Sequence, residues 1–137
     1  MRYLLDAKIL SEGRKKRPDP KVLSWLLQNA PASGLSVLTI GEFVKGASLL
    51  PAGKRRRDLE AWIVELEQEF AGRLLPLDAH EMRAWGRLYG KLQAAGTQPP
   101  LFDSLLAATA LSHDLTFVTR NTADFANTGV TVLDPFH

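Results

Sequence analysis

The chain has 137 residues, 45% of them hydrophobic, which is enough for a buried core, so residues 1–137 are expected to form a single domain. The absence of cysteine excludes disulfides and thiolate metal sites, and the three histidines have no close ligand spacing, so a zinc site is not expected. The formal net charge is only +2, but basic residues are grouped at 14–17 and 54–57. Such groups can hold a polyanion backbone, although a solvated loop or helix end accounts for them equally well.

The amino terminus shows no pattern of an export signal. Asp6 interrupts the first apolar run long before it reaches signal-peptide length, and no long uncharged apolar run follows. The sequence therefore predicts a cytoplasmic protein without a membrane span.

In the first half of the chain, short apolar runs alternate with segments of helical period, and Gly or Pro separates several of them. The expected elements are a strand at 3–5, a short helix broken near Gly13, a helix from Pro20 to about Pro31, a strand at 35–38, a helix opening at 39–42, and a long helix from Arg57 to Phe70.

The second half continues the alternation. Pro76 in the strand expected at 74–77 indicates an edge position or a strand end, and Asp78 can cap the next helix. A very apolar helix starts near Asp103, and strands are expected at 116–119 and 130–133. Alternating strands and helices predict an α/β fold, a three-layer α/β/α arrangement around a mostly parallel sheet of about five strands.

Four acidic residues each stand where an apolar run gives way to a helix start or a loop: Asp6, Glu42, Asp103 and Asp124. The carboxyl ends of parallel strands meet at one edge of a sheet, so these side chains can converge. Convergent carboxylates repel unless a cation lies among them, and Mg²⁺ or Mn²⁺ prefers such oxygen ligands. The pattern indicates phosphodiester chemistry, in which the cation lowers the pKa of a water and neutralises phosphate charge.

Each acid also has a purely structural interpretation. Residues 39–42, Thr-Ile-Gly-Glu, fit a capping box, and Asp103 can complement the positive end of its helix. Asn121 and Asp124 can shape and cap a turn. Asp6 is harder to explain in this way, because a carboxylate at the inner end of a buried strand needs a cation or several donors to stay charged.

The candidate residues lie in four stretches, residues 4–6, 36–42, 102–110 and 118–125. The order and spacing of these stretches resemble the motifs of PIN-domain proteins, specifically VapC-type toxins, and the resemblance covers nearly the whole chain. The resemblance implies a PIN-like fold and a Mg²⁺- or Mn²⁺-dependent endoribonuclease, the toxin of a type II toxin–antitoxin pair. It further implies neutralisation by a VapB-like antitoxin and an RNA substrate such as a transfer RNA.

Carried over to this sequence, the resemblance implies that the four acids bind the metal and catalyse, and that Thr119 and Asn121 support the pocket. Similar proteins form homodimers, and the apolar helices carrying Trp62 and Trp85 favour a dimer here. Contact with DNA is expected only through the antitoxin.

The sequence departs from the family directly after Asp6. The family has Thr and then Asn or Ser, whereas this chain has Ala7 and Lys8. Lys8 can point to solvent or substrate phosphate, damp metal affinity, or fill the metal position. The alternative function is therefore a catalytically impaired binding module that acts with a DNA-binding antitoxin in operon repression. A DNA-directed nuclease with the same metal site is a third, weaker hypothesis.

Overall fold

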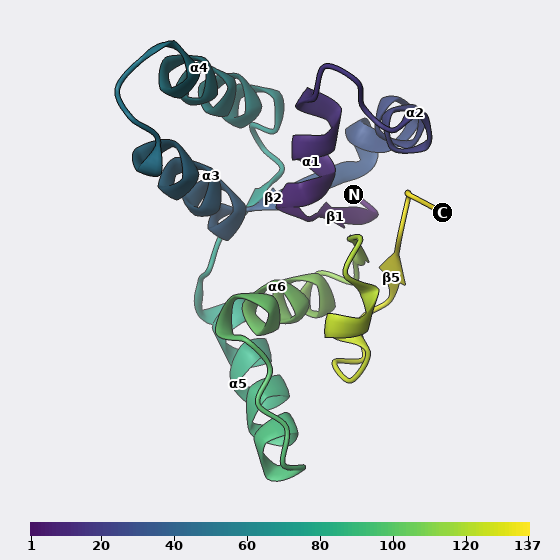
Figure 1. The fold of residues 1–137 in the computed structure, drawn as a ribbon. Coiled ribbons are helices and arrows are strands. Elements are labelled where there is room, and N and C mark those ends of the chain that lie inside the picture. Colours follow the sequence, from purple (N-terminus) through teal and green to yellow (C-terminus); the bar gives the residue numbers. More distant parts are fainter.

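The computed structural model describes all residues 1–137 and contains one five-stranded sheet in the order β3-β2-β1-β4-β5 (Figure 1). Every neighbouring pair of strands is parallel, which confirms the expected α/β class and sheet. The strands are β1 Tyr3–Leu5, β2 Ser33–Ser36, β3 Leu74–Leu75, β4 Thr116–Val118 and β5 Val132–Leu133.

The helices lie on both faces of this sheet, with α1 to α4 on one side and α5 and α6 on the other (Figure 1). This arrangement confirms the three-layer expectation. The α-helices are α1 Ala7–Arg14, α2 Pro20–Asn29, α3 Val37–Leu49, α4 Lys54–Glu69, α5 Ala79–Ala94 and α6 Leu101–Ser112, and two short 3-10 helices are η1 Ala30–Ala32 and η2 Thr122–Phe125. None of the helices combines the length and the hydropathy that a membrane span requires.

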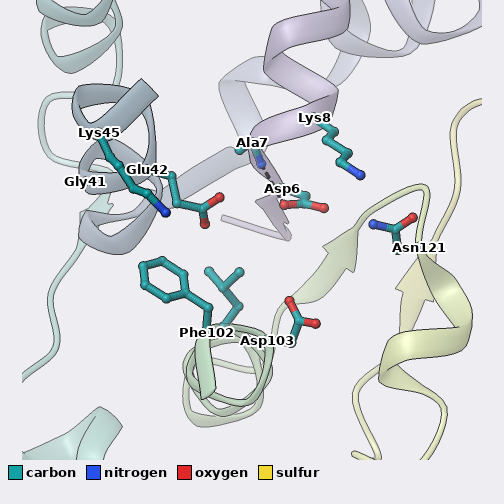
Figure 2. Close-up of a pocket in the computed structure, with 10 residues that line it drawn as sticks. Asp6, Ala7, Lys8, Gly41, Glu42, Lys45, Phe102, Asp103 and Asn121 are labelled. Carbon is teal, nitrogen blue, oxygen red and sulfur yellow. Dashed lines mark hydrogen bonds between the residues drawn. The ribbon is translucent and has the colours of Figure 1, made fainter. Parts of the chain in front are cut away.

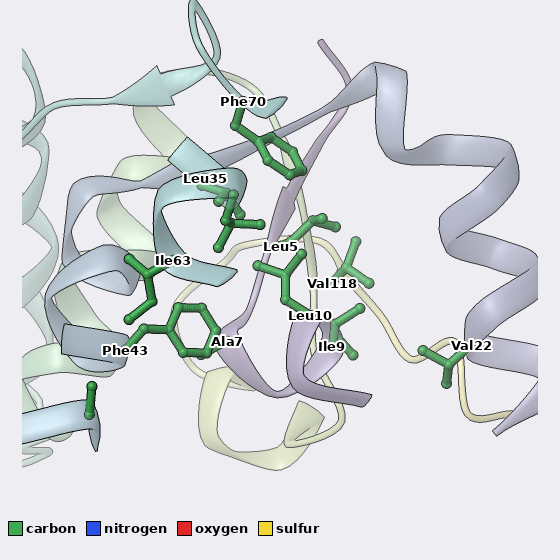
Figure 3. Packing of buried hydrophobic residues seen from close by; sticks show 12 residues of the cluster. Leu5, Ala7, Ile9, Leu10, Val22, Leu35, Phe43, Ile63, Phe70 and Val118 are labelled. Carbon is green, nitrogen blue, oxygen red and sulfur yellow. The ribbon is translucent and has the colours of Figure 1, made fainter. Parts of the chain in front are cut away.

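The central strand β1 supplies both halves of the core. Consecutive strand residues point to opposite faces, so Leu5 joins the cluster beneath α1 to α4 while Leu4 joins the cluster beneath α5 and α6. Both side chains are fully buried. In Figure 3, Leu5 and Val118 from neighbouring strands pack near Ile9 of α1. Burial on both faces explains why β1 reads as an uninterrupted apolar run.

Helix α6 packs closely on the sheet because its buried face is built from small residues. All seven residues from Ser104 to Ala110 are buried, and Ala107, Ala108 and Ala110 belong to the second core cluster. Since alanine side chains keep the helix near the strands, the first turn of α6 is held against the carboxyl edge of the sheet. The central packing expected for this helix is confirmed.

The expected start of α3 is wrong. β2 ends at Ser36, and Val37 and Leu38 are helical rather than extended. The N-cap of α3 is Ser36, whose Oγ accepts a hydrogen bond from the Leu38 N–H at 3.1 Å. Thr39 is therefore inside the first turn, fully buried, and its hydroxyl has no hydrogen-bond partner. The capping-box interpretation of residues 39–42 fails, which leaves Glu42 free of any capping role.

The cap expected at Asp78 is confirmed, whereas Asn121 at the start of η2 makes no side-chain cap hydrogen bond. The Asp19 side chain accepts from the Lys21 N–H with Pro20 at the first helical position, and Asp78 and Glu81 form a capping box at the start of α5. β3 is an edge strand, as Pro76 indicated. These caps fix where the helices begin, and with them the loops at each edge of the sheet.

Candidate functional site

A cavity of about 460 Å³ opens at the carboxyl edge of the sheet (Figure 2). It is lined by the carboxylates of Asp6, Glu42 and Asp103, which come from the end of β1, the second turn of α3 and the first turn of α6. Asn121, which follows β4, also lines it. Residues far apart along the chain thus meet at one place, as the parallel sheet topology requires.

Asp6 is held by donors on both of its oxygens. Its Oδ1 accepts from the Ala7 N–H and its Oδ2 from the Thr119 hydroxyl, each at 2.8 Å. The Thr119 hydroxyl in turn accepts from the Asn121 N–H at 3.1 Å, and Thr119 is fully buried at the end of β4. The carboxylate of Asp6 is therefore fixed in orientation by hydrogen bonds from two strand ends.

Glu42 and Asp103 share an electrostatic environment that disfavours their charged forms. Burial raises the pKa of Glu42, and the charges of Asp6 and Asp103 raise it further, while Lys45 opposes them. Burial likewise raises the pKa of Asp103, with Asp124 and Asp6 adding repulsion and Lys8 opposing it. The carboxylates are therefore close enough to repel one another inside a partly desolvated pocket.

Asp124 occupies a different position from the other three acids. It is exposed, lies in η2, and does not line the cavity, although its charge contributes to the raised pKa of Asp103. The structure thus brings three of the four expected acids into the cavity and leaves Asp124 near Asp103, outside the lining.

Two lysines with a favourable electrostatic effect on the acids lie at the cavity wall. Lys8 on α1 and Lys45 on α3 both line it and are exposed. Neither ammonium forms an ion pair with a carboxylate. Figure 2 shows the Lys8 side chain extending from α1 beside Asp6, on the side of Asn121. Lys8 therefore does not fill the space between the carboxylates in this structure.

The residues of the cavity fit a hard divalent cation. The donors are carboxylate oxygens and the Asn121 amide, the ligand types that Mg²⁺ and Mn²⁺ prefer. No three of the acids place one carboxylate oxygen each within 4.8 Å of one another. The one group of three acidic or histidine side chains that does so is His80, Glu81 and His113. A cation that keeps several waters and binds one or two carboxylates suits such an open arrangement.

A second hollow of about 260 Å³ adjoins the first and shares Glu42 with it. Arg14 and Lys15, from the basic group at 14–17, line it. Lys15 is ion-paired with Glu12 at 2.9 Å, whereas the Arg14 guanidinium lies 5.4 Å from the centre of the Trp62 ring. Positive charge therefore borders the acidic cavity on the α1 side.

Sequence reasoning missed several of these features. Lys45 lies about one helical turn beyond Glu42, and Phe102 directly precedes Asp103. Their closeness to these acids in the sequence could have indicated that both residues line the cavity. The convergence of His80, Glu81 and His113 had no such signal, because it depends on how α5 and α6 cross. His80 and His113 are therefore far apart in the sequence but close together in the fold.

Comparison with known proteins agrees with this geometry. The PIN domain family model matches residues 3–130. The chain is 33% identical to VapC ribonuclease Y4jK of Sinorhizobium fredii, covering 97% of this chain and 96% of that protein. It is also 33% identical to toxin FitB of Neisseria gonorrhoeae, covering 98% of both chains. The solved structure of FitAB bound to an IR36 DNA fragment superposes with a TM-score of 0.90 at 31% identity, covering 98% of this chain and 96% of that one.

The chain belongs to the PIN domain family, because the family model matches almost all of it. The parallel α/β/α fold and the carboxylates at the carboxyl edge of its sheet agree with this class. Within that family its similarity lies with VapC-type toxins.

Proposed function

We propose that the chain is a single PIN domain that acts as a metal-dependent endoribonuclease toxin of the VapC type. The observation that carries the proposal is the convergence of Asp6, Glu42 and Asp103 in one cavity, where burial and mutual repulsion raise the pKa of Glu42 and of Asp103. Such a cluster is unfavourable in a protein that binds no cation, so the acids are best explained as metal ligands. Asp124 completes the set from outside the cavity lining.

The bound Mg²⁺ or Mn²⁺ would lower the pKa of a water and neutralise charge on the phosphate. The chain itself supplies orientation and charge around that centre. Thr119 and the Ala7 N–H fix Asp6, and Asn121 positions Thr119. Lys8 and Lys45 stand on the cavity wall without carboxylate partners, so their ammonium groups are available to hold RNA phosphates.

The decisive experiment is cleavage of total RNA by the purified chain with Mg²⁺, with Mn²⁺ and with EDTA. Asp103→Asn, Lys8→Asn and the exposed control Asp58→Asn are tested beside it. We expect discrete products that require the metal, persist in Asp58→Asn, and fall by about a hundredfold or more in Asp103→Asn. Metal-independent cleavage, or full activity in Asp103→Asn, would refute the proposed site. Cleavage by Lys8→Asn alone would identify this chain as a disabled member of the family.

A second candidate function is a binding module that acts with a DNA-binding antitoxin, and Lys8 is the residue that favours it. The similar FitAB assembly was solved on DNA, which supports operon binding through a partner here as well. An apolar groove of about 370 Å³ between α1, α2 and α4 suits an antitoxin segment; Leu26, Leu27 and Phe70 are among its lining residues. We propose a VapB-like antitoxin as partner and a homodimer as the state of the toxin.

One experiment distinguishes the toxin from the binding module, namely RNA cleavage and operator-DNA binding measured with and without the antitoxin. A complex with a VapB-like antitoxin that shifts operator DNA, formed by a chain that never cleaves RNA in any tested metal, would favour the binding module. RNA cleavage that is suppressed when the antitoxin is added would favour the toxin.

A further inference from the structure

A second cluster of metal-binding side chains lies far from the acidic cavity. His80 and Glu81 stand in the first turn of α5, and His113 caps the end of α6. Their donor atoms all lie within 4.8 Å of one another. Asp103 lies in the first turn of the same helix that His113 ends, so about 15 Å of helix separates the two sites.

The hydrogen bonds of this cluster hold the carboxylate in place. Glu81 is 3% exposed; its Oε1 accepts from the Asp78 N–H at 2.8 Å and its Oε2 from His113 Nε2 at 2.6 Å. His80 Nε2 donates to the Ser112 carbonyl at 2.8 Å and its side chain is exposed. Glu81 is thus buried and held by two hydrogen bonds, His113 is half-buried, and His80 is exposed with a single hydrogen bond to the backbone.

We propose that His80, Glu81 and His113 form a binding site for a transition-metal ion of the zinc class, separate from the acidic cavity. Two imidazoles and one carboxylate match the ligand preference of Zn²⁺, which the all-oxygen cavity does not. The ion takes the place of the proton between His113 and Glu81, and water from the exposed side fills the remaining position. The Asp78 N–H that holds the other carboxylate oxygen is the kind of outer contact that orients metal ligands.

The geometry requires only side-chain adjustment. Ligand bonds of about 2.0 Å in a tetrahedron place donor atoms about 3.3 Å apart, so the His113–Glu81 contact opens slightly and the His80 ring turns inward from Ser112. Both ring movements occur at helix ends with solvent on one side. The bound ion joins the first turn of α5 to the last turn of α6, and it therefore stabilises the packing of these two helices.

The test measures binding of Zn²⁺ by calorimetry and of Co²⁺ by visible absorption, in the full chain carrying Asp103→Asn so that the acidic cavity lacks a ligand. Into this background we introduce His80→Gln, His113→Gln, and the matched control His137→Gln, an exposed histidine outside the cluster. We expect one ion per chain, unchanged affinity in His137→Gln, and affinity at least about tenfold weaker in each of the other two.

Absence of saturable Zn²⁺ binding in the Asp103→Asn chain would overturn the proposal, as would unchanged affinity in His80→Gln. Circular dichroism without metal checks the fold of each variant. If His113→Gln does not fold, the exposed His80→Gln carries the test alone. Neither result depends on whether the chain cleaves RNA.

Discussion

At the scale of single residues, Asp6 keeps two hydrogen-bond donors despite the departure that follows it in the sequence. Ala7, directly after this aspartate, offers no side-chain donor. In the structure the Ala7 N–H and the Thr119 hydroxyl occupy both oxygens of Asp6. One donor to Asp6 is thus the adjacent backbone and the other comes from the end of β4, while Lys8 forms no ion pair with the carboxylates.

The repulsion within the cavity sets a pH-dependent stability. The raised pKa of Asp103 means that the folded state binds the proton more tightly than the unfolded state, so stability falls as pH rises from the ordinary value of 3.8 through the folded pKa. The Asp103→Asn substitution removes this loss of stability at higher pH. We expect the variant to melt above the wild type at pH 7 and to lose this advantage near pH 3, as measured by thermal denaturation without divalent metal.

Glu65→Gln, an exposed acid on α4, serves as the control for this measurement and should show no comparable gain. A lower melting temperature for Asp103→Asn at pH 7 would mean that the carboxylate stabilises the fold, and the repulsive cluster would be contradicted. A cation added at pH 7 should narrow the difference, because it favours the wild type.

The alternation of strands and helices was sufficient to predict that Asp6, Glu42 and Asp103 converge, because Asp6 follows β1 and the other two lie in the first two turns of α3 and α6. It was not sufficient to separate Asp124 from them, since its exclusion from the cavity depends on the path of η2. Nor did it indicate His113 beside Glu81, a hydrogen bond between residues 32 positions apart.

At the scale of elements, the boundary between β2 and α3 was the main error. Residues 35–38 form a short, mostly apolar run, in which periodicity cannot separate strand from helix. The deciding residue is Ser36, because its Oγ caps the helix and places Thr39 inside the first turn. Elements with strong start signals were placed correctly, such as α2, which begins at Pro20 with Asp19 as its N-cap.

This boundary can be tested with two substitutions in one turn. Ser36→Ala removes the cap and should cost about 1 kcal/mol of unfolding free energy. Thr39→Val replaces a buried hydroxyl that has no partner, so the free energy of unfolding should stay equal or rise. Urea denaturation of both variants measures the difference. The reverse order, with Thr39→Val the more damaging, would restore Thr39 as the cap.

At the scale of the whole molecule, alternation of strands and helices was enough to predict the layers and the parallel sheet, because crossover connections place helices on both faces. The strand order, with β1 at the centre, was not readable from the chain. That order decides which loops meet, and it places the basic residues of α1 beside the acidic cavity.

The charge arrangement predicts a path for RNA from the acidic cavity across Glu42 to Arg14. Arg14→Gln combined with Lys45→Gln should weaken RNA binding and reduce its salt dependence, by about 0.7 in the log–log slope for each phosphate that is no longer neutralised. Lys15 is left in place because it neutralises Glu12. Fluorescence anisotropy of labelled RNA at several salt concentrations gives the slope.

The matched control is Arg55→Gln with Arg57→Gln, which removes the same charge from exposed positions of the group at 54–57. Equal losses of affinity in both double variants would show that RNA responds to net charge alone, and the path past Glu42 would be wrong. The basic group at 14–17 would then be a solvated helix end.

The pairing of β1 with β4 has a consequence for the synthesis of the protein. Tyr3 aligns with Thr116, and Asp6 receives its hydroxyl donor from Thr119, so the first and last parts of the acidic cavity are separated by most of the chain. During translation the amino-terminal segment leaves the ribosome early. The cavity beside it cannot form until residues up to 121 have been synthesised and released from the ribosome. The acidic cavity of a nascent chain therefore stays incomplete for most of its synthesis.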